Sequence, residues 1–140
     1  PYEPLQIHPS QKQKVGERLA FLALNKTYGF NTIICESPSF KEMNIKDDKV
    51  MIHFNNECGG MSRFMDIQGF EIAGADRVFH PAKAEHFWQP GGGAWDECFV
   101  ISSPEVKQPV AVRYCFRNFL LGNLGNAGGL PLFPFRTDNW

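Results

Sequence analysis

The sequence predicts a mainly β protein, an antiparallel β-sandwich preceded by one long α-helix. An amphipathic pattern of helical period covers residues 10–28, near the start of the chain. Seven short runs rich in β-branched and aromatic residues follow it, separated by turn residues. Strands that follow one another without helices between them are typical of two packed antiparallel sheets. With 140 residues, of which 43% are hydrophobic, the chain is long enough for one domain with its own core.

The helix has start and stop signals in the sequence. Ser10 is a favourable N-cap, and Gln13, three positions later, is expected to complete a capping box. From Val15 onward apolar side chains follow an i, i+4, i+7 course along one face, and Gly29 follows the last turn. Because this apolar face needs a partner and the chain begins with Pro1 instead of methionine, we expect the helix to be the last element of a preceding domain in a longer polypeptide.

Strands are expected in the remainder of the chain, where side chains alternate or β-branched residues cluster. Asp47 and Asp48 are expected to form a tight hairpin turn. We expect residues 89–95 to be a flexible loop, and residues 117–140 an irregular tail laid over the surface and pinned by its aromatic side chains. The predicted strands cover residues 32–36, 40–46, 49–55, 70–74, 82–88, 97–103 and 110–116.

The composition argues against several classes of partner and cofactor. Fourteen Lys and Arg against fifteen Asp and Glu leave no basic patch for a nucleic acid or an anionic membrane surface. No apolar run approaches the roughly 20 residues that span a bilayer. His53, His80 and His86 lack the spacing that presents two imidazoles to one metal ion. The glycines at 91–93 precede a strand-like run instead of a helix, so a phosphate-binding loop is not expected, and no cofactor is predicted.

The cysteines and one serine are the next candidates for chemistry. Cys35, Cys58, Cys98 and Cys115 contain no CxxC pair, which argues against a zinc ribbon and a thioredoxin-like motif. Two disulfides and four buried thiols fit the spacing equally well. Ser62 follows a glycine pair but lacks the G-x-S-x-G elbow of many hydrolases, which favours an ordinary loop residue.

The C-terminal third carries arginines and aromatic residues with two interpretations each. Arg113, Arg117 and Arg136 could bind a carboxylate ligand in bidentate fashion, or they could tie the tail to the sandwich. Most aromatic side chains are expected in the core of the sandwich. Trp140 and Phe135 are candidates for contact with a neighbouring domain.

His8 is the candidate catalytic residue. It lies two positions before the predicted N-cap, where the positive end of the helix dipole disfavours an imidazolium and suits a neutral general base. Such a base could take the proton of a serine hydroxyl during attack on an ester carbonyl. The residues alone favour an ordinary loop histidine over this role.

Three stretches, taken in order, carry a resemblance to a known family. They are IHPSQKQKVGERLA at residues 7–20, GFEIAGADRVFHPAKAE at residues 69–85, and the run at residues 102–140 that ends in GLPLFPFRTDNW. Together they closely resemble the C-terminal part of sialate O-acetylesterases of the SGNH-hydrolase type, especially those of gut bacteria. The resemblance covers nearly the whole chain.

The resemblance implies a preceding α/β domain of flavodoxin-like order, with its serine nucleophile upstream in a G-x-S-N motif. It assigns the family's catalytic histidine, in an H-P pair before the last helix, to His8. No Gly-Ser-Asn motif occurs in the 140 residues, so the chain by itself is expected to be inactive. Leu5 stands where many SGNH enzymes have the aspartate that orients the histidine. Glu3 is the acidic residue nearest to His8 in the sequence.

These inferences combine into one prediction. Residues 1–30 are expected to be the C-terminal remnant of the SGNH catalytic domain, and residues 31–140 an accessory β-sandwich domain. The complete enzyme would remove O-acetyl groups from sialic acid or a related acetylated sugar by a Ser-His mechanism, without metal or cofactor, in the periplasm or outside the cell. Its partners would be the missing N-terminal catalytic region and the sugar ester, with no nucleic acid and no membrane. The alternative is a non-catalytic carbohydrate-binding or structural sandwich module.

Overall fold

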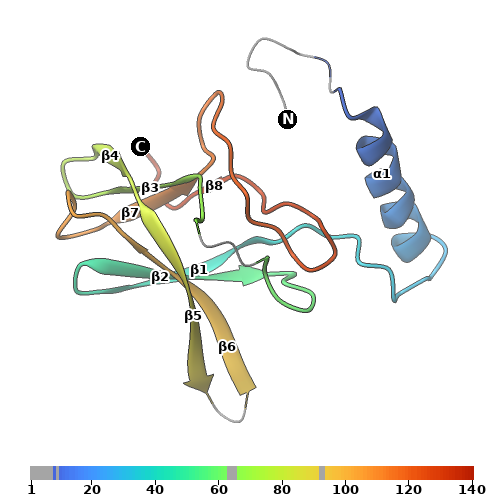
Figure 1. Ribbon diagram of the computed structural model, residues 1–140, viewed down its shortest axis with the longest axis horizontal. Helices are drawn as coiled ribbons and strands as arrows, with labels where there is room; N and C mark the ends of the chain where they lie inside the picture. Colours follow the sequence, from blue (N-terminus) through green and yellow to red (C-terminus); the bar gives the residue numbers. More distant parts are fainter. Residues whose placement is uncertain (1–7, 9, 63–65, 92–93) are drawn as a thin grey trace. The chain divides into compact units, whose positions relative to one another are not determined.

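The computed structural model describes residues 8, 10–62, 66–91 and 94–140, and residues 88–91 and 94–96 through their backbone alone. The described part contains one helix and eight strands (Figure 1). Within it, no helix is long and apolar enough to cross a bilayer. The elements are α1 (Lys12–Lys26), β1 (Ser39–Lys46), β2 (Lys49–Asn55), β3 (Phe70–Ala73), β4 (Phe79–Pro81), β5 (Lys83–Gly91), β6 (Ala94–Ser102), β7 (Ala111–Tyr114) and β8 (Phe135–Arg136).

The chain divides into two compact units, residues 1–36 and 37–140. The first unit holds the helix, and the second holds all the strands. The predicted fold class, mainly β with antiparallel sheets and one N-terminal helix, is therefore confirmed. That the first unit is the remnant of a catalytic domain stays a prediction.

Helix α1 is shorter at both ends than the predicted range 10–28. Gln11 is its N-cap and makes no side-chain capping bond, so the predicted capping box of Ser10 and Gln13 is wrong. The side-chain amide of Gln13 donates instead to Glu17, one turn further on, at 2.7 Å. This i, i+4 hydrogen bond on the exposed side of the helix competes with the bond that a capping box requires between the Gln13 side chain and the N-cap backbone. The helix ends at Lys26 with Thr27 as its C-cap, before the predicted end at residue 28. The predicted left-handed conformation of Gly29 is confirmed by its φ of 78°.

The predicted strand at residues 32–36 is absent, and that segment folds back onto the end of the helix. The backbone N–H of Ile33 donates to Phe30 O at 3.0 Å, and the side chain of Asn25 donates to Ile33 O at 2.9 Å. Glu36 forms an ion pair with Lys26 at 2.7 Å. These local bonds occupy backbone groups that a strand would present to a neighbouring strand.

The second unit contains two four-stranded antiparallel sheets, in the orders β1-β2-β6-β5 and β4-β3-β7-β8. Asp47 and Asp48 form the predicted tight hairpin between β1 and β2, with Asp47 at a φ of 56°. The chain passes from the second sheet to the first between β4 and β5 at Ala82, whose N–H donates to Phe70 O on β3 at 3.1 Å.

The predicted loop at residues 89–95 is wrong at both of its ends. Strands β5 and β6 run on through it, with Gln89 opposite Asp96 and Gly91 opposite Ala94. Residues 92–93 lie outside the described part. Glycine and proline are tolerated here because β5 is an edge strand, where one side of the backbone makes no ladder bonds.

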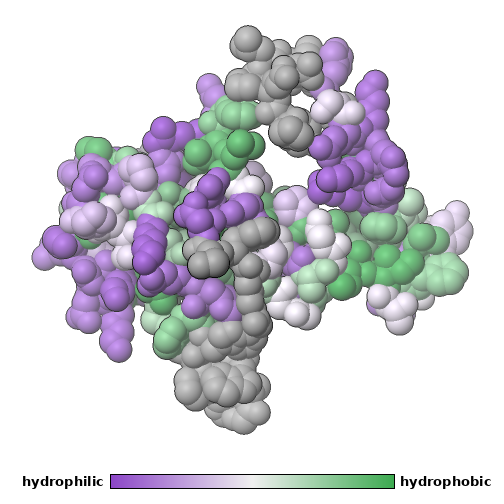
Figure 2. Space-filling view, viewed as in Figure 1, coloured by the Kyte–Doolittle hydropathy of each residue, from purple (hydrophilic) through white to green (hydrophobic). Residues whose placement is uncertain are grey.

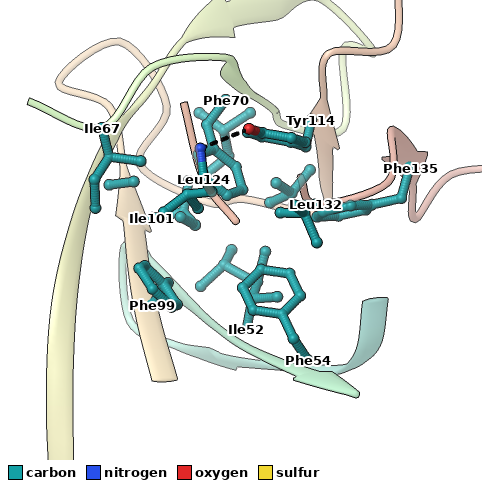
Figure 3. Packing of buried hydrophobic residues seen from close by; sticks show 14 of the residues in the cluster. Ile52, Phe54, Ile67, Phe70, Phe99, Ile101, Tyr114, Leu124, Leu132 and Phe135 are labelled. Atoms are coloured by element: carbon teal, nitrogen blue, oxygen red, sulfur yellow. Dashed lines mark hydrogen bonds between the residues drawn. The ribbon is translucent and has the colours of Figure 1, made fainter. Parts of the chain in front are cut away.

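One apolar core lies between the two sheets, and its strand residues come from the predicted alternating patterns. Ile52 on β2, Phe99 and Ile101 on β6 face Phe70 and Tyr114 of the second sheet across the core (Figure 3). The deepest side chains, with almost no exposed surface, include Val50, Ile52, Ile72, Phe99, Ile101 and Val112.

The tail lies over the surface only in part, because several of its apolar residues complete the core. Figure 3 shows Leu124, Leu132 and Phe135 among the side chains of the two sheets. The Leu124 N–H donates to the hydroxyl of the buried Tyr114 at 3.1 Å, and the Leu132 N–H donates to Leu124 O at 2.9 Å. The tail then forms β8, which pairs Phe135 with Tyr114 on β7. The tail is therefore a structural part of the sandwich.

Phe135 was a predicted contact for a neighbouring domain, and that prediction is wrong. Its ring centroid lies 5.1 Å from Phe40, 6.0 Å from Phe54 and 6.1 Å from Tyr114, so it joins aromatic side chains of both sheets. Alternation could not identify it, because only two residues of the tail around it form a strand.

Replacing Phe135 by alanine should destabilise the 140-residue chain by about 3–5 kcal/mol, because it removes a buried ring that both sheets contact. Phe133→Ala is the matched control and should cost at most about 0.5 kcal/mol, because Phe133 is 55% exposed and Phe135 only 8%. Urea denaturation of the two variants measures the difference. Equal losses of unfolding free energy would show that the tail does not complete the core.

Candidate functional site

His8, the predicted general base, lies in a bend before α1 with its side chain exposed to solvent. The helix begins at Lys12, so the histidine stands four positions before the first helical residue. The positions of Glu3 and Leu5, which bear on what orients the imidazole, lie outside the described residues. An exposed imidazole is accessible to a hydroxyl group from another segment of polypeptide.

Ser62 is a structural residue in this chain. Its hydroxyl donates to Gly125 O and accepts from Gly125 N–H, each at 2.8 Å, and its own N–H also donates to Gly125 O. This arrangement joins the segment after β2 to the tail. The interpretation of Ser62 as a loop residue, and not as a nucleophile, agrees with these contacts.

The other three histidines are distributed over the second unit. His53 is buried on β2, His80 on β4 pairs with Glu105, and His86 on β5 pairs with Glu97 on β6. Among the described residues, no group of three or more His, Cys, Asp and Glu side chains could hold a metal ion.

Glu97 is a buried carboxylate that the sequence analysis did not identify. One oxygen contacts His86 Nε2 and the other accepts the Met61 N–H at 3.1 Å, so both oxygens have a partner. Its position two residues before Phe99 on the same strand placed it on the core-facing side, which was the signal available in the sequence. The pairing itself joins residues 36 positions apart and has no local signature.

Arg113 and Arg117 tie the tail and the loop after β7 to the sandwich, which favours the structural interpretation of these two arginines over binding of a carboxylate ligand. Arg113 donates two bonds of 2.8 Å to the carboxylate of Asp138, whose side chain is fully buried. Arg117 makes a bidentate pair with Glu71 on β3. Arg136 lies 3.9 Å from Asp138. The hydrogen bonds from Arg113 lower the pKa of Asp138 below its ordinary value, and they raise the pKa of Arg113.

None of the four cysteines, all of which the structure describes, is in a disulfide. The alternative of two disulfides is therefore wrong. The alternative of four buried thiols holds only in part, because Cys98 is buried whereas Cys58 is exposed. Burial raises the pKa of the Cys115 thiol. Trp140 is partly exposed with Arg77 above its ring at 5.1 Å, and its contact with a neighbouring domain stays a prediction.

An open groove of about 710 Å³ lies on the outer side of the first sheet. The floor of the groove is formed by Val100 on β6, which stands opposite Met51 on β2 and Glu85 on β5. The exposed Phe87 and the ammonium of Lys49 border it. The groove thus combines an accessible aromatic ring with side chains of both charges.

The lysines near this groove favour the ionised form of Glu85. Lys83 forms an ion pair with Glu85 and holds the pKa of that carboxyl below its ordinary value. Lys49 acts in the same direction.

Comparison with solved structures shows that the chain is similar to part of an esterase. The crystal structure of a novel carbohydrate acetylesterase from Xanthomonas citri matches it with 37% sequence identity and a TM-score of 0.84. The match covers 99% of this chain and 31% of that one. The chain resembles part of a carbohydrate acetylesterase. This chain spans about a third of the length of the acetylesterase chain. No family model and no curated protein matches this chain.

The likeness to an acetylesterase agrees with the family resemblance at the level of a carbohydrate esterase. It runs through both units, because nearly the whole chain is aligned. His8 is the one residue of the chain for which the resemblance implied a catalytic role, and its position is compatible with contact from outside the described residues.

Asp138→Asn should lower the unfolding free energy at pH 7 by about 1.5–3 kcal/mol, because it weakens two charge-assisted bonds from Arg113. The pKa of Asp138 is lowered in the folded state, so the carboxylate contributes its stability above the unfolded pKa of about 3.9. That contribution is lost as the pH falls through the folded value. The gap between parent and variant should therefore be full at pH 7 and shrink below about pH 4.

Asp47→Asn is the control for this titration, because Asp47 is an exposed aspartate of the β1–β2 turn. Urea denaturation at several pH values measures both variants. A gap for Asp138→Asn that stays constant down to pH 2 would contradict the assignment of this stability to the ionised pair.

Proposed function

We propose that this chain is part of a carbohydrate O-acetylesterase that removes acetyl groups from sialic acid or a related acetylated sugar. The observation that carries the proposal is the 37% identity, over 99% of the chain, with part of a carbohydrate acetylesterase. The choice of sialic acid rests on the family resemblance of the three stretches described above. By the same resemblance, the enzyme works in the periplasm or outside the cell.

In the proposed mechanism His8 is the general base. Its imidazole takes the proton of a serine hydroxyl that comes from the esterase region of the polypeptide, and the serine oxygen attacks the acetyl carbonyl. His8 then gives the proton to the departing sugar oxygen as the acyl-enzyme forms. In the second half, His8 takes a proton from water and hydroxide adds to the acyl carbon. Acetic acid leaves as the proton returns to the serine oxygen, and it then loses its own proton to the solvent as acetate. The exposed side chain of His8 supports this role, because the serine must approach it from another segment.

The second unit has a supporting role in this proposal. Ser62 is bonded to Gly125 through its hydroxyl, and the carboxylates of Glu71 and Asp138 are paired with arginines. Their bonds hold the sandwich together. The reaction therefore requires the nucleophile and the oxyanion donors from the rest of the enzyme.

His8→Ala in the complete gene product should lower kcat for an aryl acetate by about 100-fold or more, because general bases contribute about 10²–10⁴ to rates. His80→Gln is the matched control and should keep activity within a few-fold, because His80 pairs with Glu105 on the sandwich. An initial-rate assay measures both. Activity of the His8→Ala variant close to that of the parent would remove the catalytic assignment.

The groove on the first sheet favours a second function, a carbohydrate-binding module. Phe87 is 46% exposed at its border, and an exposed aromatic face next to charged side chains is suited to stacking on a sugar ring and bonding its hydroxyls. This function requires no nucleophile. A carbohydrate-binding module could also be part of the same polypeptide as an esterase domain, where it would bind the sugar substrate.

Titration of the 140-residue chain with a sialoside tests the second function. If the groove is a sugar site, binding should be saturable in the millimolar range or tighter, and Phe87→Ala should weaken it about tenfold, equivalent to about 1.4 kcal/mol. Phe133→Ala removes a ring that lies elsewhere and is 55% exposed, and it should leave binding unchanged. A calorimetric titration with no saturable heat would instead support a scaffold role for the sandwich.

A further inference from the structure

The loop that follows β7, residues 116–121, exposes four large apolar side chains. They are Phe116, Phe119, Leu120 and Leu121, and this segment is called the apolar loop below. Figure 2 shows hydrophobic surface where the loop projects from the sandwich, at the upper centre of the view. Three of the four residues are consecutive, and a consecutive exposed apolar run is unfavourable in water unless it has a partner.

The first end of the apolar loop is fixed to the second sheet. The N–H of Cys115 donates to Gly69 O at 2.8 Å. Arg117, inside the loop, makes a bidentate pair with the buried carboxylate of Glu71 on β3. Bidentate pairs fix direction as well as distance. The ring of Phe116 lies under the guanidinium of Arg136, 5.3 Å away, which holds it beside the tail.

The second end is fixed by close packing and by hydrogen bonds. A Cβ at Gly122 would collide with the Tyr114 hydroxyl and the Cys115 sulfur, so the backbone passes directly over these side chains. The side chain of Asn123 accepts the Gln68 N–H at 3.0 Å and donates to the backbone carbonyl of residue 66 at 2.8 Å. The loop therefore leaves and rejoins the sandwich at two anchored points.

These anchors hold the apolar side chains outward instead of allowing them to turn into the core. A surface that is already ordered loses little conformational entropy when a partner binds, so its apolar contacts count more fully toward affinity. Leucine side chains have no polar group with which to bond sugar hydroxyls. The chemistry of the tip thus fits an apolar protein surface better than a carbohydrate.

We propose that the apolar loop docks on the esterase region of the same polypeptide, the region that corresponds to the part of the Xanthomonas enzyme outside the match. This inference rests on the proposed function. The match covers 31% of the acetylesterase chain and 99% of this one, so the matched enzyme carries more than twice as much further polypeptide in the same molecule. A covalently joined partner is present at an effective concentration of about millimolar, so a small contact is sufficient.

A second copy of this chain is a weaker candidate for the occupant. Stable interfaces between separate molecules bury about 800 Å² on each partner and use about 20–30 residues a side. A loop of six residues supplies only part of such a surface. The intramolecular partner therefore fits the size of the patch.

The test compares Leu121→Asp with Val78→Asp, because the two side chains are 54% and 52% exposed and Val78 lies outside the apolar loop. In the 140-residue chain both variants should keep the thermal midpoint of the parent within about 2 °C, because neither side chain is buried. In the complete gene product, Leu121→Asp should speed proteolytic release of the sandwich at least fivefold, and Val78→Asp should leave the rate unchanged. Leu121→Ser, which adds no charge, should give a smaller increase in the same direction.

Equal release rates for the parent, Leu121→Asp and Leu121→Ser would overturn the proposal. It would also be overturned if the 140-residue chain sedimented as a dimer that Leu121→Asp dissociates, because the occupant would then be a second copy. Hydrolysis of an aryl acetate by the parent gene product is measured in parallel. Absence of that activity refutes the proposed function, whereas the release rates alone decide whether the loop docks on the rest of the polypeptide.

Discussion

The second unit depends on the closure of a single apolar core by residues that lie outside the regular sheet pattern. Two four-stranded sheets face each other, and the tail supplies side chains that fill the space between them. Phe135 contacts rings on both sheets, and the Tyr114 hydroxyl accepts the backbone N–H of Leu124. Because protein interiors pack without voids, the core between the sheets is complete only when the tail is in place. The tail is therefore part of the core of this sandwich.

Paired carboxylates fix the loops around this core. Glu71 holds the loop after β7 through Arg117, and Glu97 holds the segment after β2 through the Met61 N–H. Asp138 ties the end of the tail to β7 through Arg113. Among the described residues, no buried side-chain nitrogen or oxygen lacks a partner. A buried carboxylate without its partner would be costly, so each pair specifies where its loop attaches. The apolar loop owes its outward direction to one of these pairs.

The sequence predicted the parts of the fold that have local signatures. Alternation identified β2, and Asp47 with Asp48 identified the hairpin before it. Strands β4 and β8 were missed because three and two residues are too short for a period to be recognised. The glycines at 91–93 indicated a loop, although paired strands reach almost to its centre. The carboxylate partners of Arg113 and Arg117 could not be identified, because they lie 25 and 46 positions away in the sequence. His8 was identified through a family resemblance, and no geometric signal in the sequence alone distinguished it.

The account of function joins these parts. The polar side chains of the sandwich largely serve its own structure, and the chain resembles part of a carbohydrate acetylesterase. In the mechanism that we propose, the reactive serine therefore comes from the esterase region of the polypeptide. The most direct measurement is a crystal structure of the complete gene product. The account predicts a serine Oγ within about 2.6–3.2 Å of an imidazole nitrogen of His8, at the edge of a cleft open to solvent. A structure in which His8 faces only solvent, or is enclosed by apolar side chains far from any hydroxyl, would contradict it.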